Sequence, residues 1–228
     1  MLAQTLDFAG ITPNPARDRV QVRLPREAAA DMEPPTADHV EAVCWLLTPD
    51  YMLGALILDA TGVRVGEFES ATVGDLDESR KAWLIRASVS KTRRARWVEL
   101  PDDLYRAVVG RLPAREDRDP AAPLFGVTAD RLRTAIGRAC RDAGVPLFSP
   151  HALRHRRISL LHRQGESWAT IGEKMGQRSK IVTADTYTHA LVDVREVDRA
   201  KLLMRVSDVR AVQTPVQTPE DELAAFAG

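Results

Sequence analysis

Apolar residues recur with a helical period along most of this chain, and that period gives way to a strand-like pattern only between residues 73 and 100. Thr36 is a candidate N-cap at the start of the periodic part. The strongly apolar stretch 51–60, which ends at Thr61-Gly62, predicts a central core helix. Residues 73–100 are enriched in β-branched and aromatic residues on either side of a polar, basic connection, which predicts a small antiparallel sheet. Other helical patterns cover 36–47, 66–72, 102–112, 129–143, 151–164, 167–175 and 196–204. The sequence therefore predicts an α+β fold that is mainly helical.

Composition divides the chain into three parts. Residues 1–35 are irregular and contain Asn14-Pro15 and Pro34-Pro35, which predicts a linker without a core of its own. Residues 36–206 hold the periodic pattern and are expected to form the folded domain, which is long enough to enclose a hydrophobic core without disulfides or a metal. Residues 207–228 contain VQTP twice in succession and are expected to form a flexible C-terminal tail.

The composition of the 228 residues is that of a soluble globular protein, with 44% apolar residues and only two cysteines, Cys44 and Cys140. The longest apolar stretches are shorter than a membrane span, and the N-terminus lacks the basic region of a signal peptide. We therefore expect a cytoplasmic protein with reduced thiols and no contact with a membrane.

The formal net charge is zero, with 32 basic and 32 acidic residues, and taken alone this argues against a nucleic-acid partner. The distribution of charge changes this conclusion. Residues 78–97 carry seven basic and one acidic side chain, and residues 131–163 carry eight and one. Such a pattern indicates a local basic surface on a neutral body, although two solvated helix faces would also produce it.

Four polar features stand out from this background, and each has a plain structural alternative. Arg64 follows the apolar core helix, where a partly buried guanidinium needs an anion such as Glu67 or Asp59. Lys91 lies in a basic connection that a solvated hairpin turn would also explain. The sequence His151-Ala-Leu-Arg154 places an imidazole and a guanidinium on one side of a first helical turn, as a plain basic helix start also would. Tyr187, in DTYTHA, could simply be a core or surface aromatic residue.

The order and spacing of these features resemble the catalytic domain of the tyrosine recombinases, the phage integrase family. TGVRVGEFESATVGDLD is similar to the first-arginine block of that family, SKTRRARWVELP to its lysine hairpin, SPHALRHRRISLLHRQG to its His-x-x-Arg block, and IGEKMGQRSKIVTADTYTHAL to its Gly-His turn and tyrosine block. The resemblance covers about residues 36–200. It implies a tyrosine-recombinase-like catalytic domain at 36–206, with a small antiparallel three-stranded sheet.

The resemblance also implies a reaction, in which Tyr187 attacks a DNA phosphate and forms a 3′-phosphotyrosyl intermediate that a 5′-hydroxyl later reverses. Arg64 and Arg154 would clamp the phosphate, because guanidinium groups suit the charge of its transition state. Lys91 would protonate the leaving 5′-oxygen, and His151 would orient or deprotonate the tyrosine. Basic residues nearby would contact DNA: Arg93, Arg94, Arg96, Arg156 and Arg157.

This sequence departs from the family pattern at two points. Gln177 stands where a histidine or tryptophan normally follows the glycine of the turn, and its amide can donate a hydrogen bond to a phosphate without carrying charge. The helical domain that usually precedes the catalytic domain is represented only by 1–35, which resembles its last helix and linker. We therefore expect an N-terminally truncated site-specific recombinase.

Two alternatives share these residues: a non-catalytic DNA-binding remnant of an integrase, and an enzyme like the type IB topoisomerases. The expected partner is double-stranded DNA, bound by a homo-tetramer. The resemblance allows the tail to dock on a neighbouring subunit, but a frayed terminus explains its sequence more simply. No small-molecule cofactor is expected. No metal site is expected either, because the histidines lie without a carboxylate or cysteine set at ligand spacing.

Overall fold

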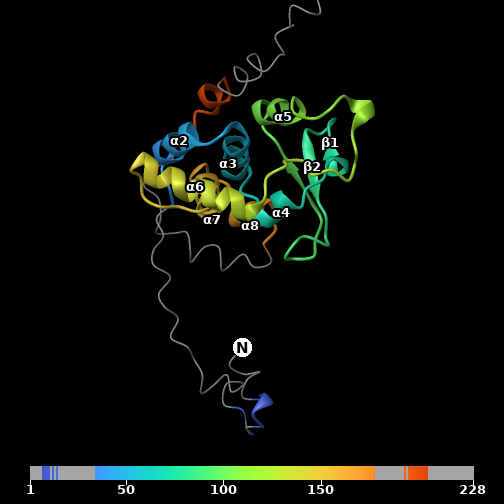
Figure 1. Ribbon diagram of the computed structural model, residues 1–228, viewed down its shortest axis with the longest axis vertical. Helices are drawn as coiled ribbons and strands as arrows, with labels where there is room; N and C mark the ends of the chain where they lie inside the picture. The colour runs from blue at the N-terminus through green and yellow to red at the C-terminus, as the bar shows by residue number, and fades with distance from the viewer. Residues whose placement is uncertain are drawn as a thin grey trace, which may run out of the picture. The chain divides into compact units, whose positions relative to one another are not determined.

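A computed structural model of the chain describes residues 7–10, 12, 14, 34–177, 193 and 195–204 (Figure 1). The chain divides into two compact units, Met1–Met32 and Glu33–Gly228, and the second unit holds the predicted folded domain. The predicted tyrosine, Tyr187, and the predicted tail 207–228 both lie outside the described residues.

Helices are the main regular element in the described part of the second unit, as predicted. They are α2 (Ala37–Leu46), α3 (Pro49–Thr61), α4 (Val65–Glu69), α5 (Asp102–Val109), α6 (Ala129–Ala143), α7 (Pro150–Arg163) and α8 (Trp168–Lys174), with short 3₁₀ turns at Val73–Asp75 and Arg115–Asp117. Residues 199–204 are also helical. The helix predicted over 66–72 is shorter than expected, because the chain turns at Ser70 into the first 3₁₀ turn.

The ends of the helices follow from local chemistry. Thr36 caps α2, since its hydroxyl accepts a hydrogen bond from the backbone N–H of His39 at 3.2 Å. Pro49 occupies the first turn of α3, where its missing N–H costs nothing. Gly62 ends α3 in the left-handed conformation, with φ of 64°.

The sheet contains three short antiparallel strands in the order β1 (Leu76–Asp77), β2 (Ala82–Ile85) and β3 (Arg96–Glu99). This confirms the predicted small three-stranded sheet. Trp83 of β2 is fully buried, lies opposite Val98 of β3 and meets the ring of Phe125 edge-on. The connection from β2 to β3 carries Lys91, Arg93 and Arg94.

Helix α3 lies at the centre of the helical part and packs against α2, α5, α6 and α7 (Figure 1). Every residue from 52 to 59 is buried, which explains why the sequence of this helix is apolar on all sides. The single charged residue in that stretch is Asp59.

Asp59 forms a buried ion pair with Arg156 of α7, whose Nη1 lies 2.8 Å from Oδ1 and 3.0 Å from Oδ2. Arg156 is 0% exposed. The neighbouring Arg157 is also buried, and its Nε donates to the backbone carbonyl of Asp59 at 2.7 Å. The guanidinium groups of both arginines are buried and hydrogen-bonded inside the protein, where an unpaired charge would be very costly. The prediction that these two arginines contact DNA is therefore wrong.

In the part of the chain that the structure describes, none of the helices has the length and apolar character needed to cross a membrane.

Replacing Asp59 with Asn tests the role of this buried pair. We expect D59N to lower the free energy of unfolding by about 3–5 kcal/mol, because it leaves the Arg156 charge buried and uncompensated. The measurement is urea denaturation followed by circular dichroism. The matched control is D50N, which removes a carboxylate paired with Arg111 at 3.1 Å but well exposed to water, and should cost about 0–1 kcal/mol. Equal losses in the two variants would contradict the prediction.

Candidate active site

Five of the six predicted catalytic residues lie in described parts of the chain, on four separate segments. Arg64 is the N-cap of α4, and Lys91 lies in the β2–β3 connection. His151 and Arg154 lie in the first turns of α7, and Gln177 follows α8. Tyr187, ten residues after Gln177, lies outside the described residues.

The imidazole of His151 lies where three of these segments meet. Its side chain is exposed, yet neighbouring atoms remove part of its water, and this desolvation lowers the pKa of His151 below its usual value. The positive charges of Arg154, Arg64 and Lys91 lower that pKa further. The structure thus brings these predicted residues together around one imidazole, which is neutral at pH 7 as a result.

Arg154 is buried, and backbone carbonyls hold its guanidinium. Nη1 donates to the carbonyl of Gly62 at 2.6 Å, and Nη2 donates to the carbonyl of Met175 at 2.9 Å. Gly62 ends α3 and Met175 ends α8, so one arginine ties the ends of two helices to the start of α7. A side chain at Gly62 would come within 2.8 Å of the Met175 sulfur, which explains why a glycine is needed there.

Arg64 forms the ion pair with Glu67 that the sequence analysis gave as a structural explanation for this arginine. It also contacts the chain at the end of α8. Its Nη1 lies 3.0 Å from Glu67 Oε1, and its Nη2 lies 3.5 Å from the carbonyl of Gly176. The side chain remains 27% exposed, so the guanidinium is still accessible to a ligand in solution.

Arg96 is predicted from sequence to contact DNA, and the structure shows a different role. Its Nη1 and Nη2 donate to the two carboxylate oxygens of Glu67 at 3.0 and 2.7 Å, and its Nε donates to the carbonyl of Lys174 at 3.2 Å. Only 11% of the side chain is exposed. With all three guanidinium nitrogens bonded internally, Arg96 is an internal support of the site, and its predicted DNA contact stays a prediction that the structure does not test.

Glu67 is the residue that sequence reasoning missed as part of the site. The sequence suggests it only as a possible partner of Arg64, and nothing in the local sequence indicates that Arg96 also pairs with it. Burial by itself would raise the pKa of Glu67, but the hydrogen bonds and charges of Arg96 and Arg64 outweigh this and lower it below the usual value. Glu67 is therefore a buried anion that orients two arginines.

Three successive carbonyls at the end of α8 accept hydrogen bonds from these arginines. Arg96 binds the carbonyl of residue 174, Arg154 that of residue 175 and Arg64 that of residue 176. The last carbonyls of a helix have no partner within it and carry partial negative charge, so guanidinium groups suit them. The chain is consequently fixed to the arginine cluster just before the segment that contains Tyr187.

The β2–β3 connection places Lys91 on the outside. The hydroxyls of Ser90 and Thr92 on either side of it are buried and lie 3.0 Å apart, whereas Lys91 itself is exposed. Arg93 adopts a positive φ of 54° and, like Arg94, is exposed. Nothing in the structure tests the predicted DNA contacts of Arg93 and Arg94, which stay predictions.

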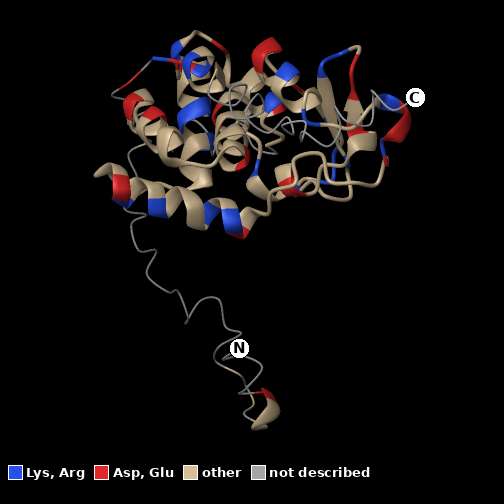
Figure 2. Cartoon of the chain, turned by 45° about the horizontal axis from the view of Figure 1, so that its top comes forward, with Lys and Arg blue, Asp and Glu red and all other residues tan. Residues whose placement is uncertain are grey.

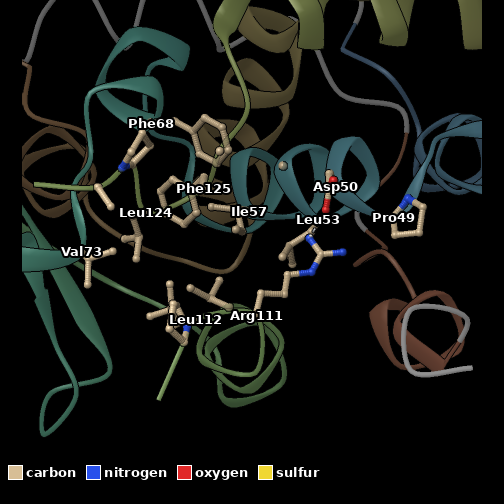
Figure 3. A pocket seen from close by; sticks show the side chains of 16 residues that line it. Pro49, Asp50, Leu53, Ile57, Phe68, Val73, Arg111, Leu112, Leu124 and Phe125 are labelled. Atoms are coloured by element: carbon tan, nitrogen blue, oxygen red, sulfur yellow. Dashed lines mark ion pairs between the residues drawn. The ribbon is translucent and has the colours of Figure 1, made fainter. Parts of the chain in front are cut away.

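Two hollows lie elsewhere on the domain. One has a volume of about 570 Å³ and is lined by apolar residues of α3, α5 and the 122–126 segment, with the Asp50–Arg111 ion pair at 3.1 Å and the stacked rings of Phe68 and Phe125 (Figure 3). None of the five described catalytic candidates lines it. The other is an open groove along α6, lined by Tyr51, Asp130, Thr134, Ala135 and three arginines, Arg131, Arg138 and Arg141.

The described residues include no group of three or more His, Cys, Asp or Glu side chains that could hold a metal ion.

The fold matches solved tyrosine recombinases. A XerA recombinase aligns over 88% of this chain and 70% of its own, with a TM-score of 0.56 and 20% identity. The Tn1549 transposon integrase, solved in complex with transposon right end DNA, aligns over 88% and 74% with a TM-score of 0.61 and 18% identity. These likenesses define the fold class as a tyrosine recombinase catalytic domain.

Sequence comparison then identifies the family. Residues 46–193 match the phage integrase family, and the chain belongs to it. Tyrosine recombinase XerC of Corynebacterium glutamicum is 29% identical over 167 residues, which are 69% of this chain and 53% of the relative. XerC of Bifidobacterium longum is 30% identical over 151 residues, 60% of this chain and 42% of the relative. The chain thus spans about half the length of the curated relatives it matches.

Gly176 offers a test of the contact between α8 and the arginines. Its φ is +61°, and a Cβ there would lie 2.6 Å from Arg96 Nη1, an atom that Glu67 holds in place. We expect G176A to cost more stability than G144A, which has a similar φ of +66° but open space around it and should cost about 1 kcal/mol. Urea denaturation of both variants measures the difference. Equal losses of stability would mean that the contact with Arg96 adds nothing to the cost of a side chain at position 176.

Proposed function

We propose that this chain is the catalytic part of a site-specific DNA recombinase that cleaves and rejoins strands through a covalent 3′-phosphotyrosyl intermediate. The observation that carries the proposal is the arginine cluster at the end of α8, where Arg64 and Arg154 donate to the carbonyls of Gly176 and Met175. The charges of these arginines and of Lys91 lower the pKa of His151, which agrees with a shared site. Family membership supports it, since the matched region contains every one of these residues. In this proposal residues 36–206 form the catalytic domain, 1–35 a linker and the remnant of a preceding domain, and 207–228 a tail.

Arg64 and Arg154 supply the charge that a phosphoryl transition state needs. When the tyrosine oxygen bonds to phosphorus, negative charge increases on the two non-bridging oxygens, and planar guanidinium groups bind such oxygens strongly. Both arginines are held before DNA arrives, Arg64 by Glu67 and Arg154 by the carbonyls of Gly62 and Met175. Preorganisation of this kind avoids reorienting the donors during the reaction.

Protons move at two atoms. Tyr187 loses its phenolic proton as its oxygen attacks phosphorus, and His151, which is neutral at pH 7, accepts that proton. The bond between phosphorus and the 5′-oxygen breaks, and Lys91 donates a proton to that oxygen. Gln177 donates an amide hydrogen bond to the phosphate. Rejoining runs the same steps in reverse with the 5′-hydroxyl of another strand, so no nucleotide or metal cofactor is consumed.

Double-stranded DNA is the proposed partner, bound at the exposed arginines. Arg93 and Arg94 in the β2–β3 connection and the three arginines of the α6 groove are exposed, which supports phosphate contacts there. Arg96, Arg156 and Arg157 are largely buried. Basic residues lie among acidic ones over the helical body, which agrees with the zero net charge (Figure 2). Exchange between two duplexes requires four strand cleavages, and a homo-tetramer acting on cytoplasmic DNA would supply them.

Trapping the adduct tests the proposal. The probe is a pool of duplexes with a randomised core and a nick placed so that the short fragment carrying the free 5′-hydroxyl diffuses away after cleavage. We expect the wild-type chain to form a protein–DNA adduct that survives denaturation and forms equally in the presence of a chelator. Y187F should form none while retaining DNA affinity, because only the nucleophilic oxygen is removed.

Other outcomes of this experiment point to the alternatives. A folded, DNA-bound wild-type chain without adduct would overturn the proposal and leave a non-catalytic DNA-binding remnant. Relaxation of arbitrary supercoiled plasmid would favour an enzyme like the type IB topoisomerases. An adduct that persists in Y187F would exclude Tyr187 as the nucleophile.

The pH dependence of cleavage tests the role of His151. Because the pKa of His151 lies below its ordinary value of about 6.5, the residue stays neutral at pH 7 and gains a proton only in more acidic solution. We expect the single-turnover cleavage rate to stay constant from pH 8 down to about pH 6.5 and to decrease in more acidic solution. H151Q should be slow throughout and lose this acidic fall. An identical acidic fall in H151Q would assign it to another group.

A further inference from the structure

Several polar contacts bind residues 193, 195, 196 and 199, which follow the proposed nucleophile in the sequence, to the helices of the domain. Six residues beyond Tyr187, the carboxylate of Asp193 accepts a hydrogen bond from the N–H of Ala37 at the start of α2, at 2.6 Å. Arg195 pairs with Asp38 and Glu41 of α2, the latter at 3.0 Å. These contacts make residues 193–199 an attachment point, which we call the distal anchor. Its other members are Glu196, bound to Arg157 of α7, and Arg199, bound to Asp103 of α5.

The pair between Glu196 and Arg157 is bidentate. Nη1 and Nη2 of Arg157 donate to Oε1 and Oε2 of Glu196 at 2.7 and 2.8 Å, which is the bidentate geometry that fixes both distance and direction. Burial raises the pKa of Glu196, but the hydrogen bonds and charge of Arg157 outweigh this and bring it below its usual value, so the carboxylate is ionised at neutral pH. The Nε of Arg157 binds the carbonyl of Asp59, which orients the guanidinium.

Helix α7 connects this anchor to the phosphate-binding arginines. Arg154 and Arg157 are three residues apart, close to one helical turn, and therefore project from the same side of α7. Arg154 binds the carbonyl of Met175, before the tyrosine segment, and Arg157 binds Glu196, after it. Adjacent turns of one helix thus hold both ends of the stretch that contains Tyr187. Arg156, one of the two residues between them, also donates to the carbonyl of Arg195.

We propose that Glu196 and Arg157 are positioning residues that set where Tyr187 stands relative to the scissile phosphate; this rests on the proposed function. The reason is geometric, since an error of about 1 Å in the placement of a reacting group can cost up to two orders of magnitude in rate. Within the described part of the chain, the polar contacts of the Glu196 carboxylate are with Arg157, Gln164 and Arg199, none of which is a proposed catalytic group. The side chain of Glu196 is 40% exposed but that of Arg157 is only 8% exposed, so loss of the Glu196 charge also costs some stability.

The test compares E196Q with D102N, which removes a different ion-paired carboxylate, that of Asp102 with Lys81 at 2.7 Å. With the DNA sequence selected from the randomised nicked pool, and at a temperature where both variants are folded, we expect E196Q to slow single-turnover cleavage by about tenfold or more, with a dissociation constant close to that of D102N. D102N should cleave at the wild-type rate. E196D, which keeps the charge, should recover part of the lost rate.

A second readout does not require activity. Hydrogen exchange of a peptide covering 193–204 should be faster in E196Q than in wild type, whereas peptides from α3 and α7 should be unchanged. Unchanged exchange at 193–204, or full cleavage activity in E196Q, would overturn the positioning role. Faster exchange in E196Q together with no adduct in wild type would instead refute the proposed function and leave the anchor as a structural attachment.

Discussion

Three arginines of α7, Arg154, Arg156 and Arg157, are buried, and the rest of the site depends on how their charges are satisfied. A guanidinium that leaves water must find hydrogen-bond acceptors inside the protein. The acceptors of these three arginines lie at the end of α3, at the end of α8 and in the distal anchor. Because each acceptor belongs to a different segment, satisfying the arginines fixes the relative placement of all three. The apolar contacts of α3 make the core, but this polar network determines the geometry around the phosphate-binding residues.

The same network changes the meaning of the charge pattern. The two basic segments contain more arginine than the surface displays, since Arg96 binds Glu67 and Arg156 binds Asp59 within the protein. A linear count of charge treats every guanidinium as available to a ligand. The structure separates them into internal supports and exposed groups, and the proposed DNA surface is correspondingly smaller and centred on the β2–β3 connection and the α6 groove.

Much of the fold could be predicted from sequence because local signals and tertiary packing agree. The helix predicted at 129–143 is α6 with the same bounds, since Thr128 caps its start and Gly144 ends it in the left-handed conformation. The helix predicted at 66–72 ends early because a backbone turn at Ser70 leads into the Thr72–Pro123 bridge. That bridge joins residues about fifty positions apart in the sequence, so a short window of sequence contains no sign of it.

The sequence by itself determined which residues are available for chemistry: an arginine after the core helix, a lysine in a hairpin, His-x-x-Arg at a helix start, and a tyrosine after a polar break. Their order and spacing were enough to indicate the family. Only the tertiary structure decided which arginines face the site and which lie in the interior, and it added Glu67 to the site. The physical reason is that the local sequence around an arginine does not show whether its side chain is exposed or buried. The acceptors that bury it come from carbonyls and carboxylates far away along the chain, such as that of Gly62 for Arg154.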